Sequence, residues 1–397
     1  MINNDEKSMR IYKSAVSALL ITLMTATTML VTPLRAAQEP DADATNVLFL
    51  PQDVREKVFG NIRGVFPNRT VSAGDSVKVL NKAYRDFAEL RYEVDGIRYS
   101  LEDFYARKAT RGIIVVQGND IKLEHYSPGH TEETRWVSFS VTKSLTSMLI
   151  GAAVKDGYIE SIDEKVADYL PRLKGTSYED VRIQDVLHMA SGVAWNEDYA
   201  DPKSDVALAG ALNGIDLVQY LAKLPKVAKP GTTFNYNTGE TNLAGELLRS
   251  AIGNNASEYL EHKIWKPYGM EHDAYWLLSS EGGVETGGCC LNATLRDYAR
   301  IGLFAKDQGV LPDGTSVLPE GWMKDSTSPS EGFDGYGYLW WLFDDGSYSA
   351  RGIFQQWIYI DPKRDLVIAT HTNAAQAVED EDHKHVAAVI QALRHAL

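Results

Sequence analysis

Strand-forming residues gather in two parts of the chain that are far apart, and this distribution restricts the possible folds most strongly. Residues 112–117 and 121–126 are two β-rich runs joined by a Gly-Asn-Asp turn, which predicts a hairpin. Strand character then returns late in the chain, at 338–343, 357–360 and 366–370. Because the residues between these groups have helical character, we expect an α+β fold: an antiparallel sheet built from both ends of the chain, flanked by helices, with a mostly helical region inserted at about 160–290.

Several segments have the periodicity of helices. Apolar residues recur at helical spacing from Val141 to Tyr158, and Ser138 and Ser140 stand where this helix should begin. Further helices are expected at 183–189, 217–224, 243–252 and 383–397. Residues 38–104 begin as a mixed, Pro-punctuated stretch, which predicts an extended lead-in segment rather than a domain of its own.

The first 37 residues have the composition of an export signal. Lys7, Arg10 and Lys13 precede an apolar stretch at 15–31, and small residues follow it near Ala37. Cleavage there would release an exported protein, periplasmic or secreted. The alternative is an uncleaved membrane anchor, because the apolar stretch is long for a signal. A membrane partner is expected only in that second case.

Charge and cysteine content limit the possible partners. The chain has 40 basic and 54 acidic residues, an excess that would repel a phosphate backbone, so we expect no nucleic-acid partner. Its two cysteines, Cys289 and Cys290, are adjacent, and neighbouring cysteines rarely form a disulfide because the ring is strained. We expect them to be small core residues. With His383 and His385 facing apart on a helix, we also expect no metal site and no cofactor.

The strongest chemical signal is the motif Ser140-Val141-Thr142-Lys143 at the start of the predicted helix. Residues three apart share one face of a helix, so the Lys143 amine can reach the Ser140 hydroxyl. A serine needs a base to act as a nucleophile, and lysine is that base only if burial lowers its pKa by about 3. The alternative interpretation is a helix-capping serine followed by a solvated lysine.

Four segments raise the first interpretation above the second, because they resemble, in order, those of the serine β-lactamase and penicillin-recognising superfamily. They are WVSFSVTKS (136–144), IDEKVADYLP (162–171), IQDVLHMASG (183–192) and PGTTFNY (230–236). The resemblance covers residues 105–397 and implies a β-lactamase-like serine hydrolase domain there. The branch it resembles most contains class C-like esterases and 6-aminohexanoate-dimer hydrolases.

The resemblance implies roles for further residues. Tyr236 matches the tyrosine that shares proton transfer with the lysine and can protonate the leaving group. The third motif of the family corresponds to Ala350-Arg351-Gly352 on a strand. The next residue, Ile353, would supply one backbone N–H of the oxyanion hole and Ser140 the other. Taken without the resemblance, Tyr236 and Gly352 could also be an ordinary packed aromatic and a plain strand glycine.

Two departures from the family pattern and one loop concern substrate binding. Thr238 stands where relatives have an asparagine, and Arg351 where they have lysine or histidine; both missing groups help to bind a β-lactam. We count Thr238, Arg351 and Gly352 as candidate substrate-binding residues. The loop Trp195-Asn196-Glu197-Asp198-Tyr199 resembles a pocket-lining loop of the aminohexanoate hydrolases, although its aromatics could equally cover the helical region. Its candidate binding residues are Trp195, Glu197 and Tyr199.

These observations together predict a serine hydrolase that cleaves a small ester or linear amide through a Ser140 acyl-enzyme, with Lys143 and Tyr236 transferring protons. Three alternatives stay open. One is a β-lactamase or D-alanyl-D-alanine peptidase. Another is a penicillin-binding or sensor protein that becomes acylated without turnover. The third is a non-catalytic binding protein on the same fold.

Overall fold

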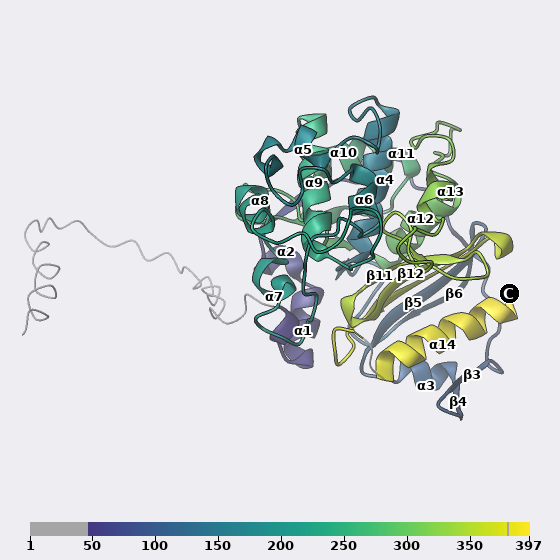
Figure 1. Cartoon of the computed structure of the whole chain (residues 1–397). Helices are drawn as coiled ribbons and strands as arrows, with labels where there is room; N and C mark the ends of the chain where they lie inside the picture. The colour runs from purple at the N-terminus through teal and green to yellow at the C-terminus, as the bar shows by residue number, and fades with distance from the viewer. Residues whose placement is uncertain (1–46, 379–380) are drawn as a thin grey trace, which may run out of the picture. The chain divides into compact units, whose positions relative to one another are not determined.

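An early strand and a late strand of the chain pair in the centre of a seven-stranded sheet, as the sequence predicts (Figure 1). The computed structural model describes residues 47–378 and 381–397. In sheet order the strands are β10 (Trp341–Leu342), β11 (Tyr348–Gly352), β12 (Gln356–Asp361), β13 (Leu366–Thr372), β5 (Thr110–Gln117), β6 (Asp120–Tyr126) and β2 (Asn81–Lys82). The central pair is antiparallel and sets Ile113 opposite Thr370. The expected export signal at 1–37 lies outside the described residues.

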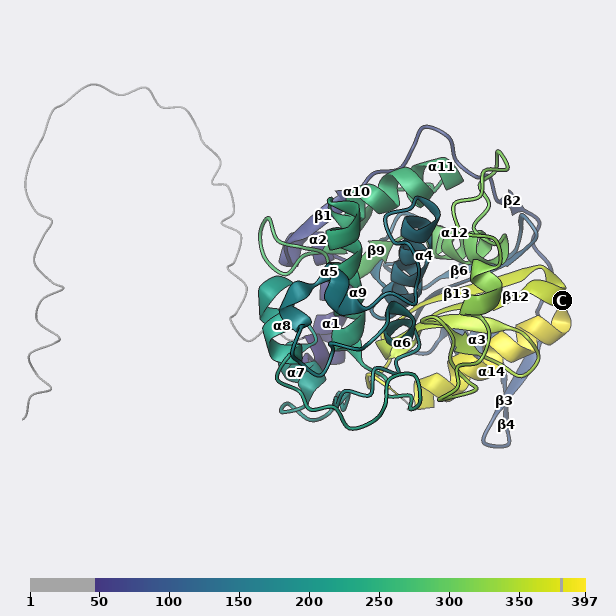
Figure 2. The same cartoon turned by 45° about the horizontal axis from the view of Figure 1, so that its top comes forward.

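Helices cover both faces of this sheet because β5 is apolar on both sides. Ile113 and Val115 pack with α14 (Glu381–Ala396), whereas Ile114 and Val116 belong to the core that contains α4 (Val141–Lys155) and α12 (Leu295–Lys306). Successive residues of a strand point to opposite faces, so one continuous apolar run can supply two cores. Figures 1 and 2 show α14 with α3 (Leu101–Tyr105) on one side and α4 and α12 on the other.

The helical region lies beside the sheet and is organised around two long helices. α4 contacts α9 (Thr238–Ile252), and both are buried along most of their length. Shorter helices surround this pair (Figure 1): α5 (Val166–Tyr169), α6 (Ile183–Leu187), α7 (Asp205–Ala209), α8 (Gly214–Leu221), α10 (Ala256–Leu260), α11 (Lys266–Tyr268) and α13 (Trp322–Ser326). Helices occur at all five expected positions, although α9 begins five residues before the expected 243.

A second sheet, of four strands, carries the chain into the start of α4. Its order is β1 (Asn68–Val71), β8 (Ala274–Leu277), β9 (Leu291–Ala293) and β7 (Trp136–Val137). A separate hairpin pairs β3 (Arg91–Val94) with β4 (Ile97–Ser100). Because β7 ends only three residues before Ser140, the second sheet determines where the segment that contains Ser140 begins and which way it runs.

Two expectations about local structure were wrong. The lead-in contains helices α1 (Gln52–Phe59) and α2 (Ile62–Val65) rather than extended chain alone, because Phe59 and Ile62 bury their side chains in a core of their own. The run at 338–343 is a strand only at Trp341–Leu342. Leu339 adopts φ 62°, and its N–H donates to the Leu187 carbonyl of α6, which breaks the strand. Among the described residues, no helix combines the length and apolarity needed to cross a membrane.

Candidate active site

Ser140 lies at the first turn of α4, directly after a constrained residue. Phe139 adopts φ 46°, a left-handed backbone that a bulky residue rarely takes. Its ring is held by Phe59 and Phe354, at centroid distances of 4.9 and 5.3 Å. Ser140 is the N-cap residue of α4, but its side chain makes no capping hydrogen bond. The alternative of a capping serine is therefore excluded, and the hydroxyl is available for chemistry.

Lys143 is a buried amine, not a solvated one. Its side chain lies one turn along α4 and the residue is only 1% exposed. Nζ donates hydrogen bonds to Thr238 Oγ1 and to the Gly288 carbonyl, each at 3.0 Å. Burial lowers the pKa of Lys143 to about 8, and the negative charge of Glu197 partly opposes that effect. A large fraction of this lysine is therefore neutral at mildly alkaline pH.

Tyr236 lies next to both Ser140 and Lys143. Lys143 Nζ is 5.4 Å from the centroid of its ring. Burial raises the pKa of Tyr236, and a side-chain hydrogen bond with Ser140 acts in the opposite direction. The ring stacks on Trp341 at 5.6 Å, and the neighbouring Asn237 caps α9 by accepting from the Glu240 N–H at 2.9 Å. These contacts hold the phenol in place beside the serine.

Glu197 is the centre of a hydrogen-bond network behind the lysine. Its carboxylate accepts from Trp195 Nε1, from Tyr199 Oη at 2.5 Å, and from both the hydroxyl and the N–H of Thr238. The carboxylate also lies at the N-terminus of α9, where the helix dipole favours negative charge. Thr238 thus connects Lys143 to Glu197. Trp195 and Glu197 hold this network, while Tyr199 and Thr238 line the adjacent cavity.

The end of strand β11 lies against the nucleophile turn because residue 352 is glycine. A Cβ at Gly352 would lie 2.3 Å from the Ser138 carbonyl oxygen and 3.1 Å from the Ser140 nitrogen. Real Cβ atoms do not approach backbone this closely, so only glycine permits this contact. The next residue, Ile353, lines the cavity together with Ser140. The two residues that are expected to supply the oxyanion donors therefore line the same cavity.

Arg351 is not brought to the cavity. Its guanidinium lies over three aromatic rings, 4.0 Å from the centroid of Trp357, 5.0 Å from that of Phe343 and 5.4 Å from that of Trp341. Its Nε also donates to Ser349 Oγ at 2.9 Å. Cation–π contacts of this kind hold the charge beside the sheet. The cation that would take the place of the family's lysine is therefore not among the residues that line the cavity beside Ser140.

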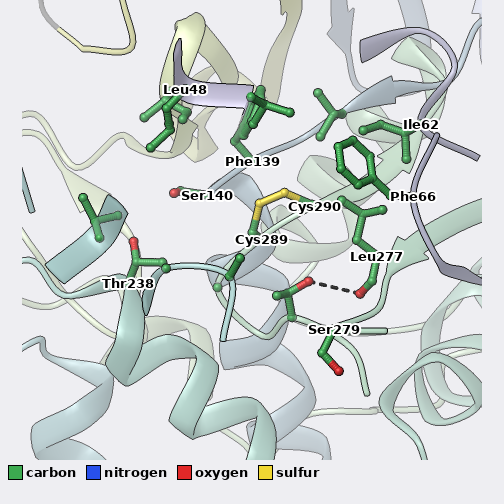
Figure 3. A pocket seen from close by; sticks show the side chains of 18 of the residues that line it. Leu48, Ile62, Phe66, Phe139, Ser140, Thr238, Leu277, Ser279, Cys289 and Cys290 are labelled. Atoms are coloured by element: carbon green, nitrogen blue, oxygen red, sulfur yellow. Dashed lines mark hydrogen bonds between the residues drawn. A yellow bond between two sulfur atoms is a disulfide. The ribbon is translucent and has the colours of Figure 1, made fainter. Parts of the chain in front are cut away.

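A cavity of about 520 Å³ opens beside Ser140 (Figure 3). Its lining carries no charged side chain among the described residues. The lining residues are Val47, Leu48, Phe59, Ile62, Phe66, Pro67, Val137, Phe139, Ser140, Tyr199, Val206, Ala207, Gly210, Ala211, Thr238, Leu277, Leu278, Ser279, Thr286, Gly288, Cys289, Cys290 and Ile353. The volume is within the range of about 300–1,000 Å³ that is usual for small-ligand sites.

The two cysteines form a disulfide in the wall of this cavity, so the expectation of two unlinked core residues was wrong (Figure 3). Cys290 adopts φ 89°, a backbone conformation that lets two adjacent side chains turn toward each other. The N–H groups of Cys290 and Leu291 both donate to Thr142 Oγ1 at 3.0 Å. The chain around the disulfide is thereby tied to α4, the helix that carries Ser140 and Lys143.

Sequence reasoning did not connect residues 47–67 or Gly288 with the site. Gly288 and its neighbour Gly287 come close to α9: a Cβ at Gly287 would lie 2.5 Å from the Thr241 carbonyl oxygen. The paired glycines before the cysteines were the available signal for a close approach of backbone. For the apolar residues of the lead-in there was no such signal. Within the described part of the chain, no group of three or more His, Cys, Asp or Glu side chains could hold a metal ion.

Comparison with known proteins identifies a matching family and a similar hydrolase. Residues 101–392 match the family model described as Beta-lactamase. A 6-aminohexanoate-dimer hydrolase of Paenarthrobacter ureafaciens is 28% identical, over 78% of this chain and 83% of that protein.

Two solved structures share the fold. A protein of Bacillus anthracis described as a 6-aminohexanoate-dimer hydrolase superposes with a TM-score of 0.75 at 22% identity, covering 86% of this chain and 94% of its own. A family VIII carboxylesterase superposes with a TM-score of 0.56 at 17% identity, covering 73% of this chain and 93% of its own. At these identities the likeness supports the fold alone.

Proposed function

The chain belongs to the Beta-lactamase family and is a serine hydrolase, and from that membership we propose that it cleaves an ester or a linear amide through an acyl-enzyme on Ser140. The observation that carries the proposal is the buried Lys143. Its amine lies one helical turn from the serine with its pKa lowered to about 8. An amine in that state can accept a proton, which a solvated lysine at neutral pH cannot.

The proposed reaction has two halves. Neutral Lys143 accepts the proton of Ser140 Oγ as that oxygen attacks the carbonyl carbon, and the N–H groups of Ser140 and Ile353 donate to the resulting oxyanion. The proton then passes through Tyr236 to the leaving oxygen or nitrogen, whose bond to carbon breaks. Water attacks the Ser140 ester in the second half, and Ser140 recovers its proton as the acid is released.

The surroundings of Ser140 favour an ester or linear amide over a β-lactam or a peptide with a free terminal carboxylate. Substrates of the last two kinds carry a carboxylate that needs a cation. Arg351, which stands in place of the family's cation, is engaged by Trp357, Phe343 and Trp341. The similar protein from Paenarthrobacter ureafaciens is named for the hydrolysis of a linear amide. That name supports including amides in the proposal.

Covalent labelling and turnover together test the proposal. Incubation with a fluorophosphonate should add its mass to Ser140, and 4-nitrophenyl acetate should be hydrolysed with steady turnover. Ser140→Ala and Lys143→Ala should each lower turnover by about a thousandfold, and the double variant should add little because the pair acts as a unit. Ser147→Ala is the matched control: it removes another hydroxyl of α4, one that is buried without a hydrogen-bond partner.

Three outcomes would contradict the proposal. Additive losses in the double variant would mean that Ser140 and Lys143 do not act in one step. A single burst of 4-nitrophenol without turnover would identify a penicillin-binding or sensor protein. Hydrolysis of nitrocefin at rates equal to those on esters would instead identify a β-lactamase.

A further inference from the structure

We propose that the cavity beside Ser140 binds the acyl part of the substrate, that this acyl group is uncharged and apolar, and that residues 47–67 form the outer wall which selects it. The inference rests on the proposed function, because it names the substrate class of the same site. Residues 47–67 precede the segment matched by the family model, which begins at residue 101. The selecting wall is therefore a feature of this chain outside the matched region.

The first support is the chemistry of the lining. The lead-in side contributes the apolar side chains of Val47, Leu48, Phe59, Ile62 and Phe66. Leu277, Leu278 and the Cys289–Cys290 disulfide add further apolar surface to the lining, and Figure 3 shows Leu277 beside Phe66 and Ile62. Burying an unpaired ammonium or carboxylate among such groups is strongly unfavourable. An alkyl chain, in contrast, gains from every methylene group that it removes from water.

The second support identifies which part of the substrate enters. In the proposed reaction Tyr236 gives its proton to the leaving group, so the leaving group must lie beside the Tyr236 hydroxyl. Neither Tyr236 nor Arg351 is among the lining residues of the cavity, whereas Ser140, Thr238 and Ile353 are. The cavity thus extends from the serine on the side away from the leaving group. That side is occupied by the acyl chain.

The third support is that the wall is fixed to the rest of the domain. Arg55 of α1 donates to the Ala374 carbonyl at 2.6 Å and to Asn373 Oδ1 at 3.3 Å. At the end of α1, Phe59 packs on the Phe139 ring at 4.9 Å and on Phe354 at 5.4 Å. A wall anchored in this way presents a defined surface. The wall also contacts Phe139, the residue directly before the nucleophile, so its position relative to Ser140 is fixed.

A series of 4-nitrophenyl esters with one leaving group tests the inference. For the acetate, butyrate and hexanoate, kcat/KM should rise about threefold to fourfold for each added methylene group. The 6-aminohexanoate ester and the adipate monoester place a positive or a negative charge at the end of a similar chain. Both should be at least about thirtyfold poorer than the hexanoate.

A pair of neighbouring variants tests the wall itself. Leu48 lines the cavity, whereas Phe49 of the same turn is 48% exposed and does not. Leu48→Lys should abolish the preference for longer acyl chains and raise the relative rate on the adipate monoester, and Phe49→Lys should change neither. If Leu48→Lys fails to fold, the half-buried Phe66 makes the same test from another part of the wall as Phe66→Lys, with Asn61→Lys at an exposed residue outside the lining as its control.

The outcomes separate this inference from the proposed function. Labelling of Ser140 and hydrolysis of the acetate, combined with a flat chain-length series or a preference for a charged acyl group, would overturn the acyl pocket and leave the proposed function standing. Equal effects of Leu48→Lys and Phe49→Lys would overturn the role of the wall. Absence of both labelling and hydrolysis would overturn the proposed function and the inference with it.

Discussion

The pH dependence of acylation should report the protonation of Lys143. Since burial lowers the pKa of this amine to about 8, its neutral form predominates above pH 8 and falls about tenfold for each pH unit below it. If neutral Lys143 is the base, kcat/KM for a 4-nitrophenyl ester should be about ninetyfold lower at pH 6 than at pH 9. The value of kcat/KM should fall as the pH is lowered below 8, because protonated Lys143 cannot act as a base.

A substitution at Glu197 should shift the pKa of Lys143 in a direction that the structure determines. Its negative charge raises the pKa of Lys143 through the network at Thr238. Glu197→Gln should therefore lower the pKa of Lys143 and move the acid limb of the profile to lower pH. The control is Glu93→Gln, since Glu93 is an exposed residue on β3 and lies outside this network.

The assay is kcat/KM from pH 5.5 to 9.5 at constant ionic strength, with the Ser140→Ala variant used to subtract spontaneous ester hydrolysis. kcat/KM is the appropriate quantity because it reports ionisations of the free enzyme. A flat profile between pH 6 and 9 would refute the assignment of Lys143 as the base. A limb that moves to higher pH in Glu197→Gln would refute the electrostatic reasoning.

Three further changes have predictable results. Lys143→Met should raise the free energy of unfolding in urea by up to about 3 kcal/mol at pH 7, because the pKa of the Lys143 amine falls from 10.5 to about 8 on folding. This gain in stability should shrink as the pH rises from 8 to 10.5, and a loss of stability at pH 7 would contradict the reasoning. Gly352→Ala should lower kcat at least about a hundredfold, since its Cβ would displace Ser138 and Ser140, and near-normal kcat would refute the close contact. Arg351→Met should leave kcat/KM on neutral esters within about threefold but lower the free energy of unfolding by about 1 kcal/mol, because the cation–π contacts are lost. A large loss of activity without a loss of stability would show that Arg351 reaches the substrate.

Sequence patterns predicted the parts of the fold that local residues determine. The hairpin of β5 and β6 follows from two β-rich runs and a Gly-containing turn, and α4 begins where Ser140 indicates. The late strand at 338–343 was overestimated because Leu339 bonds to α6, a contact between residues far apart in the chain. The aromatic composition of that run is typical of a strand, so composition alone could not reveal the interruption.

The candidate site was also predicted only in part, because contacts between residues far apart in the chain could not be read from the sequence. Ser140 and Lys143 share one helix, so their proximity could be read from spacing. The resemblance supplied Tyr236 and Ile353. Glu197 was expected to face the substrate, but its oxygens accept hydrogen bonds from Trp195, Tyr199 and Thr238. These contacts form because of the way in which the loop at 195–199 folds over α9, which the sequence does not reveal. The apolar wall from the lead-in could not be predicted, because nothing in residues 47–67 indicates which surface they cover.

The pairing of β5 with β13 has a consequence for the order in which a functional molecule can arise. A chain emerging from the ribosome presents Ser140 and Lys143 long before Ile353, and the centre of the main sheet stays open until residues 366–372 have been made. Such distant partners are slow to find each other. Any fragment cut short before β13 would hold a nucleophile without the scaffold that positions it, so hydrolytic capacity should emerge only once synthesis is almost complete.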